Sequence, residues 1–600
     1  MPVISRYSRA LLPLALIAFG LSEATAFAQG ALTNGDTHTG TIATPGQIDV
    51  WTFSAAQGNY IALEIAEIVA NPDPGFMPYM RLVNHDTGEI IMTVTGALAA
   101  QIAVNAASTA TYDVFVRDSN INRPGTALGS YTVTLVKAPG ALVVPTGDQG
   151  GAMTNGGNHA GSIFAGDLDA WTFTAAKDDY IALSIAEVLE LDPMFRPWIR
   201  LLGPDGGVIG NPQGALAAHI AARAPLSGVY TVVVSDSAEN VEPSHQGNYI
   251  LRLVKTGAPV TVPVGDEGGA MLPGANYVGA ITIGDLDPYT FTALPGDYIA
   301  IKIGEVVLSQ TDPFFMPWIR LIGPDGAVVL SVTGDLTAAI AATATLSGTY
   351  TLLVADSGLN REPSHEGSYL LTMFRAPGTF VVPPGDHGGT LLNNVTRSGA
   401  IYSGDLDEWR FAATSGHALT VTVTDVIADP AFSPWIRLIG PTGSVVAQVS
   451  GVTTATINIV SLAATGVYTV IVGDNDINHE GSAIGNYTIT AIGVDPNVCD
   501  SGAVAGITTI RAIDVVSLRD RINSVRGHYG VPLFSFTDAD LVGAPVKTTH
   551  FVELRSALQD AYIAAGQAVP TYTDPVLTPL VTFIKAVHVN ELCVAVAFLE

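Results

Sequence analysis

The stretch Asp169-Ala-Trp171-Thr-Phe173 decides the fold, because the chain contains four versions of it. The other versions are Asp49-Val-Trp51-Thr-Phe53, Asp287-Pro-Tyr289-Thr-Phe291 and Asp407-Glu-Trp409-Arg-Phe411. Successive aspartates are 120, 118 and 120 residues apart. A unit of that length can enclose its own core, and it is longer than the repeats of about 20 to 50 residues that build most solenoids. The spacing therefore predicts four related domains in a row.

Two further blocks recur in every copy. One places an arginine two residues after an aromatic side chain, as in Phe195-Arg-Pro197-Trp198-Ile-Arg200-Leu201. The other keeps an aspartate 13 residues before a tyrosine, and its aspartates are Asp118, Asp236, Asp356 and Asp474. Because these recurrences lie within one chain, they mark positions that each copy uses.

Inside a copy, hydrophobic residues alternate with a period of two. From Tyr180 to Glu187, the side chains of Ile181, Leu183 and Ile185 alternate with small residues. This pattern predicts a strand with one face on a core and the other face outward. Turn sequences such as Gly203-Pro-Asp-Gly206 separate the runs. We therefore predict a mainly β protein, with four tandem jelly-roll-like antiparallel β-sandwich domains followed by a small all-α domain.

The predicted boundaries follow the repeats and the proline-containing joints between them. They are 1–28 for a signal peptide, 29–140, 141–258, 259–378 and 379–496 for repeats 1 to 4, and 497–600 for the helical domain. The helical domain contains three related units, and Val515, Leu518 and Ile522 in the first unit follow helical spacing. Proline at the joints limits bending, so we expect a semi-rigid row of domains.

The amino terminus predicts export. Arg6 and Arg9 precede the uncharged run Leu11–Gly20, and Ala26-Phe27-Ala28 supplies the small-x-small pattern of a cleavage site. The apolar run is shorter than the roughly 20 residues that a membrane-spanning helix needs. We therefore expect cleavage near Ala28 and a secreted, extracellular or cell-surface protein without a membrane span.

Composition and missing motifs narrow the function. The chain carries 54 acidic and 26 basic residues, for a net charge of −28. Such a surface repels nucleic acid phosphates and attracts divalent cations, although acidity also serves solubility alone. The sequence has no His-Glu-x-x-His, Gly-x-Ser-x-Gly, Walker or Cys-x-x-Cys motif. We therefore predict that the protein is not an enzyme.

The order of the motifs resembles the bacterial pre-peptidase C-terminal domain. The resemblance rests on Asp-x-Trp/Tyr-x-Phe, the Leu-x-Gly-Pro-Asp-Gly turn, Gly-x-Tyr-Thr-Val and Gly-x-Tyr, and it covers roughly residues 30 to 493. It implies a jelly-roll-like fold and an accessory role beside secreted enzymes, often peptidases. Relatives of the family include calcium-associated collagen-binding domains. The Phe-x-Pro-Trp-Ile-Arg-Leu block departs from the Asp-rich strand expected in the family.

Two loops are candidate calcium sites. Their oxygen ligands stand at alternate positions, which lets a looped chain point them at one hard cation. The residues are Asp118, Asn120 and Asn122 in repeat 1, and Asp474, Asp476 and Asn478 in repeat 4. The alternative is that these side chains hydrogen-bond their own backbone and shape the loop. Calcium is the one cofactor that the sequence suggests.

The aromatic–arginine block is a candidate ligand platform. On a strand, Trp198 and Arg200 share a face, and so do Trp318 with Arg320 and Trp435 with Arg437. An exposed pair would bind a sugar or a peptide. The alternative is a packed tryptophan with the arginine stem laid over it.

The chain has two cysteines, Cys499 and Cys593, and they bracket the helical domain. In an exported protein two cysteines usually pair, so we predict a disulfide between them. Equivalent positions in the three helical units hold Asp514, His550 and His588. These residues suggest either metal binding or helix capping.

Together these features predict a secreted, non-catalytic binding or adhesion protein. Four similar domains in a row give reach and avidity toward an extracellular polysaccharide or protein ligand. One alternative is a structural spacer or surface-layer component docked through the helical tail. Another is an accessory module of a secreted peptidase system.

Overall fold

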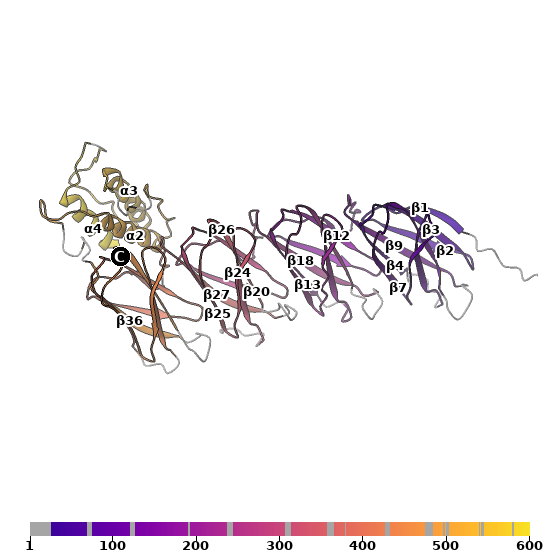
Figure 1. The fold of residues 1–600 in the computed structure, drawn as a ribbon, viewed down its shortest axis with the longest axis horizontal. Helices are drawn as coiled ribbons and strands as arrows, with labels where there is room; N and C mark the ends of the chain where they lie inside the picture. The colour runs from indigo at the N-terminus through magenta and orange to yellow at the C-terminus, as the bar shows by residue number, and fades with distance from the viewer. Residues whose placement is uncertain are drawn as a thin grey trace, which may run out of the picture.

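The computed structural model describes sixteen stretches of the chain. They are residues 26–68, 75–119, 127–189, 192–236, 244–306, 314–356, 365–378, 380–383, 385–426, 432–474, 484–495, 499, 503–538, 541, 545–578 and 581–599. The protein is mainly β, with 49% of residues in strands and 10% in helices. The four repeats follow one another along the long axis, and the helical tail lies beside the last of them (Figure 1).

Repeats 1 and 2 have the same strand pattern. Repeat 1 contains β1 (Ala26–Ala31), β2 (Thr37–Ile42), β3 (Ile48–Ala55), β4 (Tyr60–Glu67), β5 (Pro78–Asn84), β6 (Ile90–Thr95), β7 (Ala99–Asn105), β8 (Ala110–Asp118) and β9 (Gly129–Ala138). Repeat 2 contains β10 (Gly150–Ala152), β11 (Asn158–Ile163), β12 (Asp169–Ala175), β13 (Tyr180–Leu189), β14 (Pro197–Leu202), β15 (Val208–Gly210), β16 (Ala217–Arg223), β17 (Gly228–Asp236) and β18 (Gly247–Lys255).

Repeats 3 and 4 continue the pattern. Repeat 3 contains β19 (Gly269–Ala270), β20 (Asn276–Ile281), β21 (Asp287–Ala293), β22 (Tyr298–Glu305), β23 (Pro317–Ile322), β24 (Val328–Thr333), β25 (Thr337–Thr343), β26 (Gly348–Asp356) and β27 (Gly367–Ala376). Repeat 4 contains β28 (Gly388–Thr390), β29 (Thr396–Ile401), β30 (Asp407–Ala413), β31 (Leu419–Asp425), β32 (Pro434–Ile439), β33 (Val445–Ser450), β34 (Thr454–Ile459), β35 (Gly466–Asp474) and β36 (Gly485–Ile492).

Each repeat forms a five-stranded and a four-stranded sheet that face each other. In repeat 1 the strand orders are β1-β3-β8-β5-β6 and β2-β9-β4-β7. All pairings in these sheets are antiparallel except that of β1 with β3, and each later repeat also has one parallel pair. The core between the two sheets includes Trp51, Ile61, Leu63 and Tyr131.

The deciding motif links the two sheets of a repeat. The indole Nε1 of Trp171 donates to the Tyr249 hydroxyl at 2.9 Å, and that hydroxyl donates to Asp169 Oδ2 at 2.5 Å. In repeat 1, Trp51, Tyr131 and Asp49 make the same chain of hydrogen bonds. The motif therefore recurs because its polar atoms satisfy one another inside the core.

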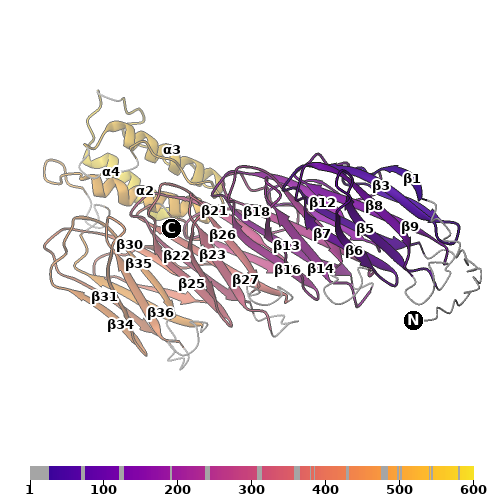
Figure 2. The same cartoon turned by 45° about the vertical axis from the view of Figure 1, so that its right-hand side comes forward.

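The outer faces of the sheets are also buried where one repeat packs on the next. Tyr60 and Ala62 of the four-stranded sheet in repeat 1 pack against Leu168, Ala170 and Val233 of repeat 2. Equivalent apolar clusters join repeat 2 to repeat 3 and repeat 3 to repeat 4. The eight sheets thus follow one another face to face along the row (Figure 2).

The predicted fold class is therefore wrong. The four repeats are not tandem jelly-roll-like antiparallel β-sandwich domains; they form one β-solenoid, in which repeats stack in one dimension and contact their neighbours. The prediction failed because it took the alternate positions of strands such as Tyr180–Glu187 as solvent-facing. Ala182 and Ser184 are instead covered by repeat 3, with 0% and 1% of their surfaces exposed.

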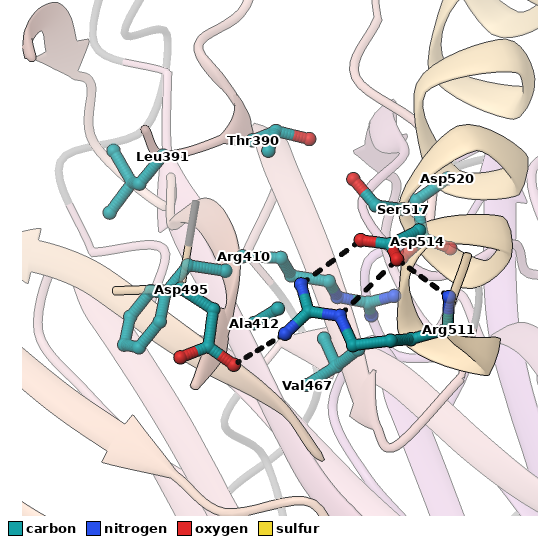
Figure 3. Close-up of a pocket in the computed structure, with 11 residues that line it drawn as sticks. Thr390, Leu391, Arg410, Ala412, Val467, Asp495, Arg511, Asp514, Ser517 and Asp520 are labelled. Carbon is teal, nitrogen blue, oxygen red and sulfur yellow. Dashed lines mark hydrogen bonds and ion pairs between the residues drawn. The ribbon is translucent and has the colours of Figure 1, made fainter. Parts of the chain in front are cut away.

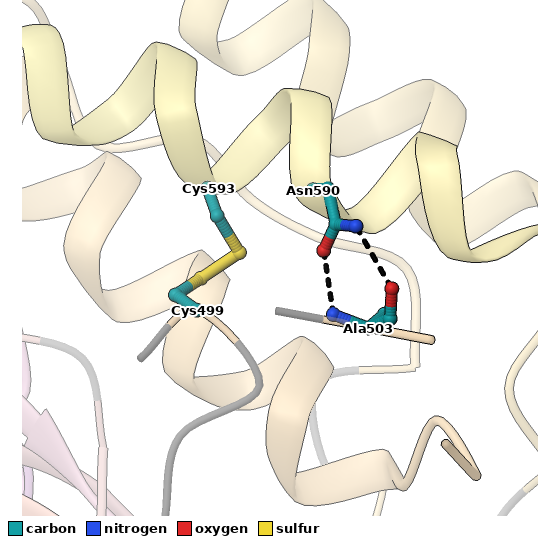
Figure 4. The surroundings of a disulfide bond; sticks show 4 residues. All are labelled: Cys499, Ala503, Asn590 and Cys593. Atoms are coloured by element: carbon teal, nitrogen blue, oxygen red, sulfur yellow. Dashed lines mark hydrogen bonds between the residues drawn. A yellow bond between two sulfur atoms is a disulfide. The ribbon is translucent and has the colours of Figure 1, made fainter. Parts of the chain in front are cut away.

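The helical tail contains α2 (Ala512–His528), α3 (Thr548–Ala564) and α4 (Ala586–Leu599) around a core that includes Leu518, Leu554 and Val596. The predicted disulfide is present, with 5.1 Å between the Cα atoms of Cys499 and Cys593 (Figure 4). Beside it, the Asn590 side chain makes two hydrogen bonds to the backbone of Ala503.

The equivalent tail residues cap their helices. Asp514 accepts a hydrogen bond from the Arg511 N–H at 2.8 Å, and His550 Nδ1 accepts one from the Lys547 N–H at 3.1 Å. The second ring nitrogen of His550 contacts Asp538. These contacts match the capping interpretation of the three helical units.

Arg511 also ties the tail to repeat 4. Its guanidinium lies between Asp514 of α2 and Asp495, which follows β36, at 3.1 and 3.7 Å (Figure 3).

No helix in the described part of the chain is long and apolar enough to cross a membrane.

The predicted signal peptide lies mostly outside the described residues. Its last residues, Ala26 to Ala28, begin β1 and pair with β3. Cleavage before Gln29 would leave a three-residue β1, the length of β10 in repeat 2. The predicted cleavage is thus compatible with the fold of repeat 1.

Candidate cation sites at the repeat joints

Acidic side chains gather at the start of repeats 2, 3 and 4. In each group, the ligand atoms all lie within 4.8 Å of one another. The groups are Asp148, Asp167 and Asp169; Asp266, Asp285 and Asp287; and Asp386, His387 and Asp407. We call them the joint clusters, because each lies where one repeat meets the next.

The backbone explains how repeat 2 places its cluster. Asp148 lies in the linker from repeat 1, Asp167 in the turn before β12, and Asp169 at the first position of β12. That turn packs on repeat 1, where the Thr134 hydroxyl donates to the Gly166 carbonyl at 2.7 Å. Gly166 has a φ of +80°, and a Cβ there would lie 2.7 Å from the Ala66 Cβ. Glycine therefore lets the turn approach repeat 1 closely.

The clusters contain buried oxygens without partners. Asp169, Asp287 and Asp407 are each 0% exposed, and each accepts one hydrogen bond from a core tyrosine. The other carboxylate oxygen of each has no hydrogen-bond partner in the described residues. Buried carboxylate oxygens need a partner, and a hard divalent cation uses this type of ligand. The residues thus fit a calcium-like ion.

Electrostatics indicate the same need for positive charge. Burial, followed by the nearby charge of Asp167, raises the pKa of Asp169 to about 9. Burial, followed by Asp285, raises the pKa of Asp287 to about 9. Burial and Asp148 raise the pKa of Asp167 to about 7. Near neutral pH, the raised pKa values of Asp169 and Asp287 favour a proton on each carboxyl group, and a cation beside them would take the place of that proton.

Repeat 1 shows the same position without a cluster. Gln47 stands near Asp49, where the later repeats have a second aspartate, and its side-chain amide donates to Asp49 Oδ1 at 2.7 Å. The Gln47 oxygen accepts from the Ala43 N–H at 2.9 Å. The amide thus satisfies the carboxylate that has no such partner in repeats 2 to 4.

The joints differ in the charge that the preceding repeat presents. Arg252 of repeat 2 forms an ion pair with Asp285 of repeat 3 at 3.0 Å. Lys302 of repeat 3 is 4% exposed and lowers the pKa of Asp405 in repeat 4 against the larger effect of burial.

The first joint has an acidic residue in place of such a cation. Glu64 of repeat 1 is fully buried, and burial raises its pKa well above the usual range, against the opposing effect of Arg200. The charge of Asp167 raises the pKa of Glu64 further. The first joint therefore brings the carboxyl group of Glu64 close to that of Asp167.

The predicted calcium loops are described only in part. Asp118 accepts hydrogen bonds from the backbone N–H groups of Met77 and Ala127, at 3.1 and 3.0 Å. Asp474 accepts one from the Ser433 N–H at 2.9 Å. These bonds fit the alternative role of fixing the loop. Asn120, Asn122, Asp476 and Asn478 lie outside the described residues. Calcium binding by these loops stays a prediction.

The structure brings each predicted Trp–Arg pair together, and places it at a joint. The guanidinium carbon of Arg200 lies 4.2 Å from the ring centre of Trp198, and the other two pairs have 4.7 Å. Each arginine donates to a tyrosine hydroxyl of the preceding repeat: Arg200 to Tyr60, Arg320 to Tyr180 and Arg437 to Tyr298. Arg200 and Trp318 are only 1% and 2% exposed. This placement favours the packing alternative, and ligand binding by the pairs stays a prediction.

Sequence reasoning missed the joint clusters, although their signal was present. Asp167-Leu-Asp169, Asp285-Leu-Asp287 and Asp405-Leu-Asp407 repeat a Gly-Asp-Leu-Asp motif, of which only the second aspartate was used as a marker of the fold. Asp148, Asp266 and Asp386 recur in a Gly-Asp step of each linker. Nothing local indicates that the two motifs meet.

Comparisons with known proteins give no family. No family model matches the chain, and no curated protein does. Among solved structures, a pre-peptidase C-terminal domain of a collagenase from Bacillus anthracis has 17% identity, covers 18% of this chain and 95% of its own, and has a TM-score of 0.15. A periplasmic inhibitor of g-type lysozyme from Aeromonas hydrophila has 13% identity, with 18% and 99% covered and a TM-score of 0.15.

A larger structure aligns over more of the chain. It is the M60 catalytic domain with two CBM51 domains of ZmpB from Clostridium perfringens, with 8% identity, 74% of this chain and 55% of that chain covered, and a TM-score of 0.12. The Bacillus domain belongs to the family that the sequence motifs resemble. At TM-scores this low, however, none of these likenesses identifies the family or the function of the chain.

Proposed function

We propose that the protein is a non-catalytic extracellular binding or adhesion protein, whose repeats form a rigid array that calcium stabilises at the joints. The observation that carries the proposal is the set of joint clusters with buried, unpartnered carboxylate oxygens in the described residues. The disulfide between Cys499 and Cys593 is consistent with an extracellular location.

Rigidity follows from how the joints are built. The outer faces of neighbouring repeats bury aromatic and aliphatic side chains, so bending at a joint exposes apolar surface. A cation held between the linker aspartate and the strand aspartates would tie the connection to the repeat that follows it. An array of this kind keeps a binding surface at a fixed distance from its anchor.

A structural spacer is the second candidate. The placement of the Trp–Arg pairs favours the spacer, because the arginine of each pair donates a hydrogen bond to a tyrosine of the preceding repeat. In a spacer, the helical tail docks the array and the repeats provide length alone. The two candidates share the calcium-dependent joints and differ in whether the array itself has a ligand.

Calorimetric titration of calcium into chelator-treated mature protein tests the shared part. We expect saturable binding and a higher melting temperature with calcium. Asp169→Asn and Asp287→Asn should each remove one site, while Asp49→Asn in repeat 1 should leave the stoichiometry unchanged. Unchanged binding in the first two variants would reject the joint clusters as calcium sites.

Binding assays on arrays of extracellular glycans and matrix proteins then separate the two candidates. If the full chain and a variant with an altered tail surface bind the same ligand, the result supports the binding protein. Binding that depends on the helical tail and is unchanged by substitutions in the repeats supports the spacer.

A further inference from the structure

A groove lies between repeat 4 and the helical tail, away from the Trp–Arg pairs. Its volume is about 770 Å³, which is within the range of small-ligand sites. Repeat 4 contributes the linker and β28 to one wall, and α2 and α4 form the other wall. We call it the tail groove, and its side chains include His387, Arg397, Arg521, His528, Val594 and Leu599.

Repeat 4 differs from the other repeats at two positions in this groove. The position of Arg397 holds His38, His159 and Tyr277 in repeats 1, 2 and 3. The position of His387 holds Gln149 in repeat 2 and Glu267 in repeat 3.

The aromatic side chain that Arg397 replaces has a structural role in the other repeats. The rings of His38, His159 and Tyr277 pack on the core aromatic residue at 5.3, 5.2 and 5.5 Å between ring centres. His159 Nε2 also accepts a hydrogen bond from the Thr154 N–H at 2.9 Å. Arg397 lacks these contacts and is exposed, and its guanidinium makes no hydrogen bond or ion pair with any described residue. Its guanidinium is thus available in the groove.

Two arginines, Arg397 and Arg521, offset the two aspartates of the groove, so the groove is less acidic than the chain as a whole. Arg521 comes from α2 and adds to Arg397, whereas His387 belongs to a joint cluster and its Nδ1 accepts a hydrogen bond from the Ala400 N–H at 3.2 Å. The acidic residues there are Asp386, which belongs to a joint cluster, and Asp520, which interacts with Arg410 and Arg519. With a net charge of −28, the chain repels polyanions elsewhere. Because salt screens charges beyond about 8 Å, the part of an acidic ligand that lies in the groove interacts chiefly with the charges of the groove.

The backbone of β28 argues against a peptide. An added peptide strand needs a regular edge with alternating donors and acceptors. Gly388 and Gly389, which start β28, have φ angles of +152° and +108°, so the edge is irregular there. Recognition in the groove must therefore come from side chains, which include the hydroxyls of Ser398 and Ser524.

We infer that the tail groove binds a short acidic oligosaccharide, with Arg397 on a carboxylate of the ligand and the serine hydroxyls on its ring oxygens. This inference rests on the proposed binding function and names its ligand class. Arginine presents a planar pair of N–H donors that matches a carboxylate.

Calorimetry with a hexamer of glucuronic acid tests the inference on the mature protein. We expect binding that weakens as salt rises, about tenfold weaker binding by Arg397→His, and no binding of an uncharged hexasaccharide of equal length. Histidine is the residue of repeats 1 and 2 at this position, so the variant should fold. Lys177→Gln, which changes an exposed basic residue of repeat 2, is the control and should bind as the unaltered protein does.

Three results would overturn the inference: no binding of the glucuronic acid hexamer, equal binding of the uncharged hexasaccharide, or unchanged affinity in Arg397→His. Tighter binding of a hexaglutamate peptide would instead assign the groove to acidic peptides. The titration is made with calcium and with chelator. Arg397-dependent binding without any calcium uptake would disprove the calcium-stabilised array and leave the groove standing.

Discussion

The joint clusters predict that the cation-free protein loses stability as pH rises. Asp167 has a pKa raised from 3.8 to about 7 in the folded protein, mainly by burial and then by Asp148. Between these values the folded state holds more protons on Asp167 than the unfolded state does, so the contribution of Asp167 to stability is fully present below pH 3.8 and is lost as pH rises to about 7. The shift of Asp167 alone corresponds to about 4 kcal/mol over that range.

Melting curves from pH 4.5 to 8 measure this effect, once with chelator and once with excess calcium. We expect a falling melting temperature with chelator and a flatter curve with calcium, because a bound cation replaces the lost protons. Asp167→Asn combined with Asp169→Asn should flatten the chelator curve, whereas Asp49→Asn should not. A chelator curve without a decline in the unaltered protein would refute the electrostatic account of the clusters.

Three further predictions concern contacts outside the clusters. Tyr180→Phe removes the hydroxyl that accepts a hydrogen bond from Arg320, so we expect repeat 3 to loosen by about 1 kcal/mol, measured by hydrogen exchange at the joint. Reduction of the disulfide, whose cysteines are 94 residues apart, should destabilise the helical tail by about 5 kcal/mol in urea unfolding, and leave hydrogen exchange in repeats 1 to 3 unchanged. Gly161→Ala places a Cβ 2.3 Å from the Tyr249 ring, so we expect a lower melting temperature. The control is Gly46→Ala, where nothing lies within 4 Å of the added Cβ and the φ of +80° adds strain of about 1 kcal/mol. The melting temperature should fall by more in Gly161→Ala than in Gly46→Ala.

The sequence was sufficient for everything that repeats locally. The four copies, the strand periodicity, the helical tail and the disulfide all follow from patterns within a short window or from a count of two cysteines. The stacking of the repeats did not follow, because alternation says that the two faces of a strand differ and not that one face meets water. The better signal was composition: Ala182 and Ala186 are small and uncharged at supposedly solvent-facing positions.

The joint clusters escaped prediction for a different reason. Asp148 and Asp169 are 21 residues apart, and they meet only because β10 pairs in parallel with β12. Parallel pairing of a short edge strand leaves little trace in sequence, since β10 has three residues, two of them glycine. Ligands brought together by such a pairing become visible only in the fold.

The first and last repeats differ from the other repeats on the outer faces that lie at the ends of the solenoid. In repeat 1, Arg117 stacks on the Tyr79 ring at 4.1 Å, at the position where the joint-forming repeats have Ser235, Ala355 and Gly473. In repeat 4, Ala418 stands at the position of the tyrosine that, in repeats 1 to 3, accepts a hydrogen bond from an arginine of the next repeat. Its outer face carries cross-strand pairs of polar residues, such as Thr422 with Thr456.

A stack of repeats needs ends that do not accept another repeat, and polar or bulky replacements at the docking positions provide them. The same logic applies to the tail groove, where Arg397 replaces an aromatic residue that packs in the other three repeats. Similarity among the repeats thus reports the fold, because every copy needs the same core. Positions that differ among the repeats indicate a role specific to one copy, and they lie at the joints, at the ends and in the groove.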